Sequence, residues 1–82
     1  MINIFYVYIL NCSDNSLYTG YTDDLEKRVR LHNEGKASKY TRAKLPVKLI
    51  YFEEHETKSS ALKREIEIKS LKRIEKLKML DL

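Results

Sequence analysis

Apolar and aromatic residues occupy every position from Ile4 to Leu10, a run that is too short to cross a membrane. Because the run is rich in β-branched and aromatic residues, it predicts a central strand that is buried on both faces. A second short run, Leu17 to Tyr21, follows the polar stretch Asn11 to Ser16. The pattern therefore predicts an antiparallel hairpin with a tight loop at Ser13-Asp14-Asn15.

After the hairpin the apolar positions adopt helical spacing. Thr22-Asp23-Asp24 offers N-cap oxygens to a helix that runs to about Glu34, and Gly35 is its expected C-terminal stop. The following connector is basic, and one turn of helix fits near Ser38 to Arg42. Pro46 cannot lie inside a helix, so it marks the end of this connector.

The last third of the chain predicts one strand and then helix. Val47 to Glu54 alternates enough for a third strand, and Thr57 or Ser59 can cap the helix after it. Past Ser70 the apolar positions change phase, which indicates two helices or a kink there. The prediction is an α+β fold, a small three-stranded antiparallel sheet flanked by helices in the order β-β-α-β-α-α.

Composition limits the class of protein. We expect a single domain over residues 1–82, and the absence of a long apolar run predicts neither a transmembrane span nor a signal peptide, hence a soluble cytoplasmic protein. The single cysteine, Cys12, cannot form an internal disulfide, and no cysteine and histidine spacing resembles a zinc site. A core this small is marginal, so the oligomeric state stays open between a monomer and a weak dimer.

Charge is distributed unevenly along the chain, whose net charge is +4. Residues 1–26 contain no lysine or arginine, whereas eight basic residues lie between Lys27 and Lys48 and another eight between Lys58 and Lys78. Nucleic acid is the natural partner for such segments, because each cation that neutralises a phosphate releases counterions. Lysine-rich helices are also ordinary solvated surfaces, so the charge pattern alone leaves both interpretations open.

The predicted hairpin places two tyrosine-bearing tripeptides, Tyr6-Val7-Tyr8 and Tyr18-Thr19-Gly20, side by side. In an antiparallel pairing Tyr8 lies opposite Gly20, and Tyr8 and Tyr18 share one face of the sheet. A glycine opposite Tyr8 leaves room above the phenol ring for a molecule that is not protein. Tyrosine is also a good strand former, so half-buried packing residues are the alternative interpretation.

The first helix carries two cationic side chains toward the sheet. Leu25 and Val29 mark its inward face, and at about 100° per residue His32 falls on that face while Arg28 lies at its edge. Inward-facing cationic groups are costly unless they pair or line a wet cleft. Alternatively, Arg28 extends to solvent and His32 is a satisfied histidine at the boundary of the core.

The helix after the third strand offers a carboxylate. Leu62 and Ile66 define its expected buried face, with Lys69 on that face and Glu65 beside it, so Glu65 can face the same cleft. The alternative is an i,i+4 ion pair between Glu65 and Lys69, which stabilises a helix by roughly 0.2–0.5 kcal/mol.

Together these residue types suit phosphodiester hydrolysis. A hard divalent cation takes oxygen ligands, so one glutamate with waters and phosphate oxygens can hold Mg²⁺ or Mn²⁺. An arginine can neutralise the charge that develops on the phosphate oxygens in the transition state. A phenol or an imidazole must then take the proton from water.

The order of these residues resembles the GIY-YIG nuclease domain, and the features that carry the resemblance are Tyr6-Val7-Tyr8, Tyr18-Thr19-Gly20, Arg28 with His32, and Glu65. Within that superfamily the chain is similar, over nearly its whole length, to small stand-alone bacterial proteins of the UPF0213 type. The most specific stretches are Ser16 to Val29, His32-Asn33 and Lys39-Tyr40-Thr41-Arg42. Tyr6-Val7 replaces the Gly-Ile of the first motif and Thr19 the Ile of the second, whereas both tyrosines and the closing glycine are kept.

The resemblance implies a catalytic role for five residues. Tyr8 corresponds to the tyrosine that orients the attacking water or acts as its general base, and with a phenol pKa near 10 the second role needs help from a nearby cation or a metal-bound hydroxide. Tyr18 would contact the scissile phosphate or the water. Arg28 would stabilise the pentacovalent phosphate, and His32 would relay a proton or contact a phosphate. Glu65 would be the sole protein ligand of one weakly held Mg²⁺ or Mn²⁺ ion.

The resemblance also implies substrate contacts by Gly20, Lys39, Tyr40, Arg42 and Lys69. Tyr40 lies where some family members place another active-site tyrosine or histidine, and Lys69 is either structural or a phosphate contact. The leading hypothesis is a metal-dependent endonuclease that acts on DNA or RNA with little sequence preference. Two alternatives stay open: a nucleic-acid-binding module without cleavage activity, and a protein-interaction adaptor on the same fold.

Overall fold

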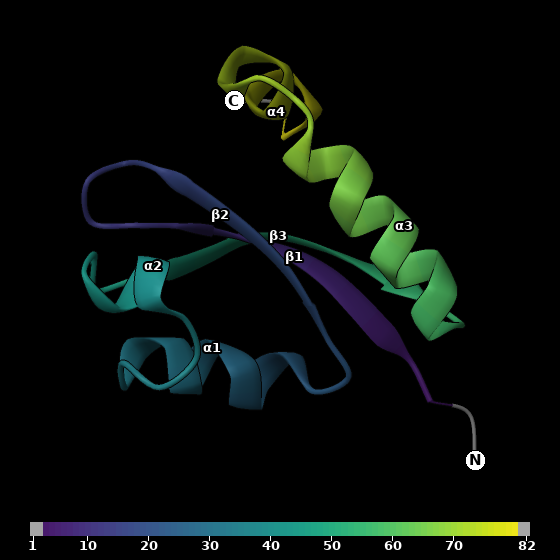
Figure 1. The fold of residues 1–82 in the computed structure, drawn as a ribbon, viewed down its shortest axis with the longest axis horizontal. Helices are drawn as coiled ribbons and strands as arrows, with labels where there is room; N and C mark the ends of the chain where they lie inside the picture. The colour runs from purple at the N-terminus through teal and green to yellow at the C-terminus, as the bar shows by residue number, and fades with distance from the viewer. Residues whose placement is uncertain (1–2, 81–82) are drawn as a thin grey trace.

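The computed structural model describes residues 3–80 of the chain. Its elements, in chain order, are β1 (Phe5–Asn11), β2 (Leu17–Thr22), α1 (Leu25–Asn33), α2 (Lys39–Arg42), β3 (Lys48–His55), α3 (Lys58–Lys69) and α4 (Arg73–Met79). Figure 1 shows these elements as an antiparallel sheet between helices, which confirms the predicted α+β class. The observed order, β-β-α-α-β-α-α, adds α2, the single turn of helix that was expected within the basic connector.

The sheet has the strand order β2-β1-β3, so β1 is the central strand. Its residues Val7 to Leu10 are buried, as the unbroken apolar run predicts. The register between β1 and β2 pairs Tyr8 with Gly20, as expected for the hairpin. On the other side, β1 pairs antiparallel with β3, and this register shifts between Ile9 and Leu10.

The hairpin loop closes through the polar groups that the sequence places there. The Cys12 amide donates to the Ser16 carbonyl at 2.9 Å, and the Asp14 carboxylate accepts the Ser16 amide at 3.0 Å. Asn15 has a φ of 67°, the left-handed region that asparagine tolerates better than most residues. The loop therefore fixes the register that brings Tyr8 over Gly20.

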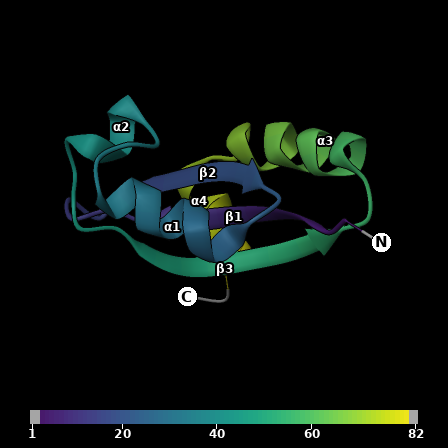
Figure 2. The ribbon, with the colours of Figure 1, turned by 90° about the horizontal axis from the view of Figure 1, so that it is seen from below.

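Helices cover both faces of the sheet, α1 and α2 on one face and α3 and α4 on the other (Figures 1 and 2). On the first face Tyr8 and Leu10 pack with Cys12 and Val47, and Leu25 and Val29 of α1 lie against them. On the second face Val7 and Ile9 of β1 pack against Ala61 and Ile68 of α3. The alternation along β1 thus divides its side chains between two small cores.

The helix ends follow the predicted capping residues. Asp24 caps α1 by accepting the Lys27 amide, and Gly35, just beyond the C-cap, has a φ of 75°. Thr57 caps α3 by accepting the Ser60 amide. Helix α3 ends at Lys69 and α4 begins at Arg73, which confirms the predicted break near Ser70.

The predicted buried face of α3 was wrong. Ile66 is 67% exposed, whereas Ala61 and Ile68 are fully buried. Ala61 and Ile68 are two helical turns apart, and the small alanine lets the helix backbone approach the sheet closely. Glu65 lies one turn from each of them, so it is on the sheet-facing side of α3. In residues 3–80 no helix is long and apolar enough to cross a lipid bilayer.

Candidate functional site

Tyr8 is the most deeply placed of the predicted site residues, with only 1% of its surface exposed. Its ring lies directly over Gly20, where an added Cβ would be 2.6 Å from the Tyr8 Oη and 2.7 Å from its Cζ. The expectation of open space above Tyr8 was therefore wrong, because the phenol itself fills the space that the missing side chain of Gly20 leaves. A glycine is required at this position for Tyr8 to lie flat on the sheet.

The Tyr8 hydroxyl contacts the imidazole of His32, with 2.8 Å between Oη and Nε2. His32 is also 1% exposed, and its Nδ1 lies 2.8 Å from the hydroxyl oxygen of Thr41. Thr41 in turn donates to the Ser38 carbonyl at 3.4 Å. Because the Thr41 proton is used in that bond, its oxygen accepts from His32 Nδ1–H, which leaves Nε2 to accept the Tyr8 O–H.

The burial of this hydrogen-bonded line keeps its members uncharged. Burial, and next the positive charge of Arg28, lower the pKa of His32 below its usual 6.5. Burial raises the pKa of Tyr8 far above 10, and the charges of Tyr18 and Glu65 raise it further while Arg28 opposes them. At neutral pH the site thus holds a neutral imidazole that accepts a hydrogen bond from a neutral phenol.

Aromatic rings continue the site from Tyr8 to the surface. The Tyr18 ring centroid lies 5.2 Å from that of His32 and 6.5 Å from that of Tyr8. On its outer side Tyr18 stacks with Tyr40 of α2 at 5.9 Å and an interplanar angle of 28°. Tyr40 is 42% exposed, and the Lys44 Nζ lies 4.1 Å from its ring centroid. Tyr18 therefore joins a buried polar pair to an exposed aromatic and cationic surface.

Arg28 lies at the edge of α1, half-buried, as the helical spacing predicts. It lines a hollow of about 300 Å³ beside the end of β2, and Lys58 at the start of α3 lines the same hollow. Its positive charge acts on both Tyr8 and His32. Arg28 thus adds a cation beside the buried pair without a direct hydrogen bond to either residue among the contacts of residues 3–80.

Glu65 approaches from the other face of the sheet, because α3 packs on the face of Val7 and Ile9 (Figure 1). Its side chain is 14% exposed, and Lys69 Nζ lies 3.4 Å from its carboxylate, the ion pair that was one of the two interpretations. The carboxylate is still near enough for its charge to raise the pKa of Tyr8. Contacts thus join Tyr8, Tyr18 and His32, whereas Glu65 is linked to them by charge alone.

The other predicted substrate contacts lie on the surface. Lys39 and Arg42 are exposed on α2, and Lys69 is 51% exposed on α3. Sequence reasoning missed Thr41 and Lys44. A buried histidine needs partners on both ring nitrogens, which is the signal that could have pointed to a hydroxyl on α2. Lys44 joins the site to the hairpin loop, since its Nζ lies 2.9 Å from the Asp14 carboxylate.

The chemistry of the donor set limits how a metal ion could be held. Over residues 3–80 no group of three or more histidine, cysteine, aspartate or glutamate side chains is arranged to hold a metal. A single partly buried carboxylate, that of Glu65, fits a hard ion whose remaining ligands are water and phosphate oxygens. The residues present therefore fit a weakly held Mg²⁺ or Mn²⁺ and do not fit a tightly held structural metal.

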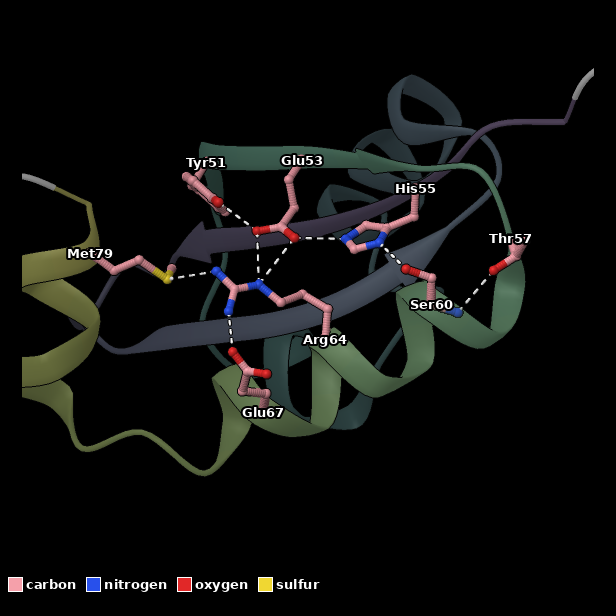
Figure 3. Close-up of polar contacts among 8 residues, drawn as sticks. All are labelled: Tyr51, Glu53, His55, Thr57, Ser60, Arg64, Glu67 and Met79. Atoms are coloured by element: carbon pink, nitrogen blue, oxygen red, sulfur yellow. Dashed lines mark hydrogen bonds and ion pairs between the residues drawn. The ribbon is translucent and has the colours of Figure 1, made fainter.

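A second polar cluster, which sequence reasoning missed, fastens α3 to β3 (Figure 3). The Glu53 carboxylate accepts hydrogen bonds from the Tyr51 hydroxyl at 2.5 Å and from Arg64 Nε at 3.0 Å, and it lies 2.6 Å from His55 Nε2. Burial alone would raise the pKa of Glu53, but these three neighbours hold it below its usual value. Arg64 also pairs with Glu67. The cluster fixes the helix that carries Glu65.

Comparison with known proteins finds a family match over most of the chain. The family model described as the GIY-YIG catalytic domain matches residues 4–78. A UPF0213 protein of Haloquadratum walsbyi is 61% identical over 87% of this chain and 80% of its own length. A UPF0213 protein of Staphylococcus saprophyticus is 55% identical over 92% of both chains.

Two solution structures are similar in fold as well as in sequence. The UPF0213 protein BH0048 from Bacillus halodurans matches with a TM-score of 0.64 and 41% identity, over 95% of this chain and 83% of that one. The protein EF2693 from E. faecalis matches with a TM-score of 0.65 and 42% identity, over 99% of this chain and 88% of that one. Both the sheet and the helices on its two faces therefore have experimentally determined counterparts.

Proposed function

The chain belongs to the GIY-YIG family and, within it, to the UPF0213 proteins, and from this premise we propose that it is a metal-dependent endonuclease that hydrolyses phosphodiester bonds in nucleic acid. The observation that carries the proposal is the hydrogen-bonded line from Tyr8 through His32 to Thr41. It supplies a neutral imidazole as proton acceptor behind a phenol, an arrangement suited to activating water.

In this proposal Tyr8 and His32 act as one general base. The phenol oxygen takes a proton from the attacking water while the phenol proton passes to His32 Nε2, and the imidazolium that forms keeps its Nδ1–H on Thr41. The raised pKa of Tyr8 rules out a stable phenolate as the resting base, so the relay needs the histidine. The hydroxide forms a bond to phosphorus and the bond to the leaving oxygen breaks. That oxygen takes a proton from solvent, and the imidazolium releases its extra proton to solvent.

Tyr18 and Arg28 bind the phosphate in this scheme. Tyr18 is half-buried and its ring contacts His32, which supports a role in which its hydroxyl meets a phosphate oxygen or the water. Arg28 offers a guanidinium beside the same residues, and it stabilises the negative charge that grows on the phosphate oxygens. Gly20, Lys39, Tyr40, Arg42 and Lys69 extend the substrate contacts on either side.

Glu65 is the proposed ligand of one Mg²⁺ or Mn²⁺ ion. Such an ion would supply Lewis-acid stabilisation of phosphate charge. The carboxylate is held beside the ammonium of Lys69, and the positive charge of Lys69 must be displaced or shared when a cation binds. A weakly held ion follows, because one carboxylate provides few of the roughly six ligands of an octahedral Mg²⁺ or Mn²⁺ ion.

The burial of Tyr8 and His32, 1% exposed each, favours a second candidate function. A binding module that does not hydrolyse nucleic acid needs no water at Tyr8. It would contact its ligand through the exposed Tyr40 and the basic residues near it. Nucleic acid would then bind through phosphate contacts and stacking on an aromatic ring. Both candidate functions require binding of nucleic acid, and only the endonuclease cleaves it.

Cleavage assays with a Glu65→Ala variant test the proposal. The purified full chain is incubated with single-stranded, duplex and branched DNA and RNA in Mg²⁺ or Mn²⁺. We expect wild type to release cleaved product only with metal, and Glu65→Ala to fall to background while it keeps its affinity for nucleic acid. Glu56→Ala, which removes an exposed carboxylate before α3, should cleave like wild type.

Two results would count against the hydrolase. Equal product from wild type and Glu65→Ala would show that the carboxylate has no part in cleavage. Binding without any product from wild type, on every substrate and with either metal, would favour the binding module instead.

A further inference from the structure

The face of the sheet that α1 covers keeps an open groove on its β3 side. The groove has a volume of about 620 Å³, and its floor is apolar, formed by Tyr6, Leu25, Val29, Leu49 and Phe52. Phe52 is 49% exposed although its ring meets that of Tyr6 edge-on at 6.1 Å. In Figure 2, which looks onto this face, no other described helix lies beside α1 over β3. A large aromatic side chain therefore remains at the surface without a helix to cover it.

The rim of this groove is acidic, and the carboxylates that line it are Asp23, Asp24, Glu26 and Glu54. Among residues 3–80, no lysine or arginine lines the groove. Asp24 caps α1, and the ion pairs within residues 3–80 include none for Asp23, Glu26 or Glu54. The groove thus combines an apolar floor with a rim of carboxylates, three of which form none of these ion pairs, on a chain whose net charge is +4.

These properties identify the kind of ligand. Like-charge repulsion disfavours nucleic acid and anionic lipid at an acidic rim. A small ligand is disfavoured because such sites bury most of their ligand, whereas the floor residue Phe52 is half exposed. An amphipathic helix laid beside α1 covers an open strip of sheet and brings its own charges to the rim.

We propose that the groove binds an amphipathic helix of a partner protein, with apolar side chains against Tyr6, Leu49 and Phe52 and with lysine or arginine side chains toward the acidic rim. From α1 the groove uses Leu25, Glu26 and Val29, whereas Arg28 lines other hollows and His32 lies in the last turn. A partner can therefore bind while the nucleic-acid side stays free. This inference does not depend on whether the chain cleaves its ligand.

A second copy of this chain is the less suitable occupant. Ile66 and Ile74 are exposed by 67% and 63% near lysines of α3 and α4, so they match the groove in chemistry. They lie, however, on elements of the opposite face of the sheet (Figure 1). A contact from that face to the groove of another copy would be heterologous, so it would build a ring or an open chain and not a two-fold symmetric dimer.

A peptide titration of the ¹⁵N-labelled full chain tests the proposal. The probe is a synthetic amphipathic helix of leucine and lysine, and its matched control has glutamate in place of lysine. We expect the lysine peptide alone to shift amide signals of residues 23–29 and 49–54. Phe52→Ala, and separately Glu26→Gln combined with Glu54→Gln, should each weaken binding by about tenfold or more.

Control variants separate the groove from general surface effects. Ile66→Ala and Glu56→Gln remove an exposed apolar group and an exposed carboxylate elsewhere, and both should bind the lysine peptide like wild type. The proposal is overturned by equal binding of the two peptides, by shifts confined to other elements, or by no shift at about 1 mM peptide. Self-association through the groove, seen as concentration-dependent shifts without peptide that Phe52→Ala abolishes, would also overturn it.

Discussion

At the scale of single residues, His32 is where the buried polar groups of the site meet. It accepts from Tyr8 on one side, donates to Thr41 on the other, and contacts the Tyr18 ring edge-on. A buried imidazole without both partners would leave an unsatisfied polar atom, which costs roughly 1–3 kcal/mol. The two hydrogen bonds therefore select one tautomer and hold it in place.

The protonation of His32 should appear in the stability of the protein. Its pKa in the folded state is lowered, so the unfolded chain takes up a proton first as the pH falls through about 6.5. We expect the free energy of unfolding to decrease as the pH is lowered from about 7 through 6.5 toward the folded pKa. Urea unfolding at a series of pH values measures this decrease.

His32→Gln provides the comparison for that measurement. The variant is less stable overall, but it lacks the part of the pH dependence that belongs to His32. His55 is present in both proteins, so it cancels in the difference. Identical pH dependence in the two proteins would mean that folding does not discriminate between the charged and neutral forms of His32.

At the scale of elements, the β1–β2 hairpin does most to build the site. Its register places Tyr8 opposite Gly20, and its loop contacts Lys44 through Asp14. The close approach of the Tyr8 ring to the backbone of Gly20 leaves no space for a side chain there. The geometry of the candidate site therefore depends on the hairpin as much as on α1.

Gly20→Ala should disturb both stability and function. The new Cβ would lie 2.6 Å from the Tyr8 Oη, so the ring must move away from His32. Overpacking of this kind costs typically about 1–3 kcal/mol. Urea unfolding and a cleavage or binding assay on the same preparation measure the two effects.

Gly35→Ala is the matched control, because it strains the backbone at a φ of 75° and leaves Tyr8 untouched. It should lose stability while its activity per folded molecule stays at the wild-type level. If Gly20→Ala behaves in the same way as Gly35→Ala, the contact between Tyr8 and His32 does not need this glycine.

Features that depend on residues close together in the sequence were predicted correctly, and features that depend on the packing of separate elements were not. The register of β1 and β2, the inward position of His32 and the caps at Asp24 and Thr57 depend on neighbours in sequence, and the structure has them as predicted. The prediction of the buried face of α3 was wrong, because the small Ala61 is fully buried while the larger Ile66 is 67% exposed.

The bonds from His32 to Thr41 and from Glu53 to Arg64 could not be predicted in the same way. Each joins residues on different elements, nine and eleven positions apart, and depends on how those elements dock. A single sequence gives the spacing within a helix or a strand. It does not give the rotation of one helix against another element, which decides such pairs.

At the scale of the whole molecule, two surfaces of opposite charge lie apart from each other. Lys39 and Arg42 are exposed on α2, and Lys44, just after this helix, lies over the ring of the exposed Tyr40. The acidic groove lies along the first turns of α1 and over β3. One chain thus presents a cationic aromatic surface and an acidic apolar surface, which suit different partners.

Nucleic-acid affinity should fall as salt rises, and the slope should depend on α2. Each phosphate contact contributes about 0.7–0.9 to the slope of log affinity against log salt. We expect Lys39→Ala combined with Arg42→Ala to reduce the slope by about 1.4–1.8, as measured by fluorescence anisotropy over a salt series. Lys63→Ala combined with Lys78→Ala, which removes two exposed cations from α3 and α4, should leave the slope unchanged. The reverse result would place the nucleic acid on the other face of the sheet.

The central claim is that catalysis passes through the bond between Tyr8 and His32, and single-turnover cleavage by Tyr8→Phe tests it most directly. The substitution removes one oxygen from a buried ring and keeps its packing over Gly20. The account predicts that the metal-dependent cleavage rate falls by about 10²–10⁴-fold while nucleic-acid affinity is unchanged. Cleavage by Tyr8→Phe at the wild-type rate would contradict it.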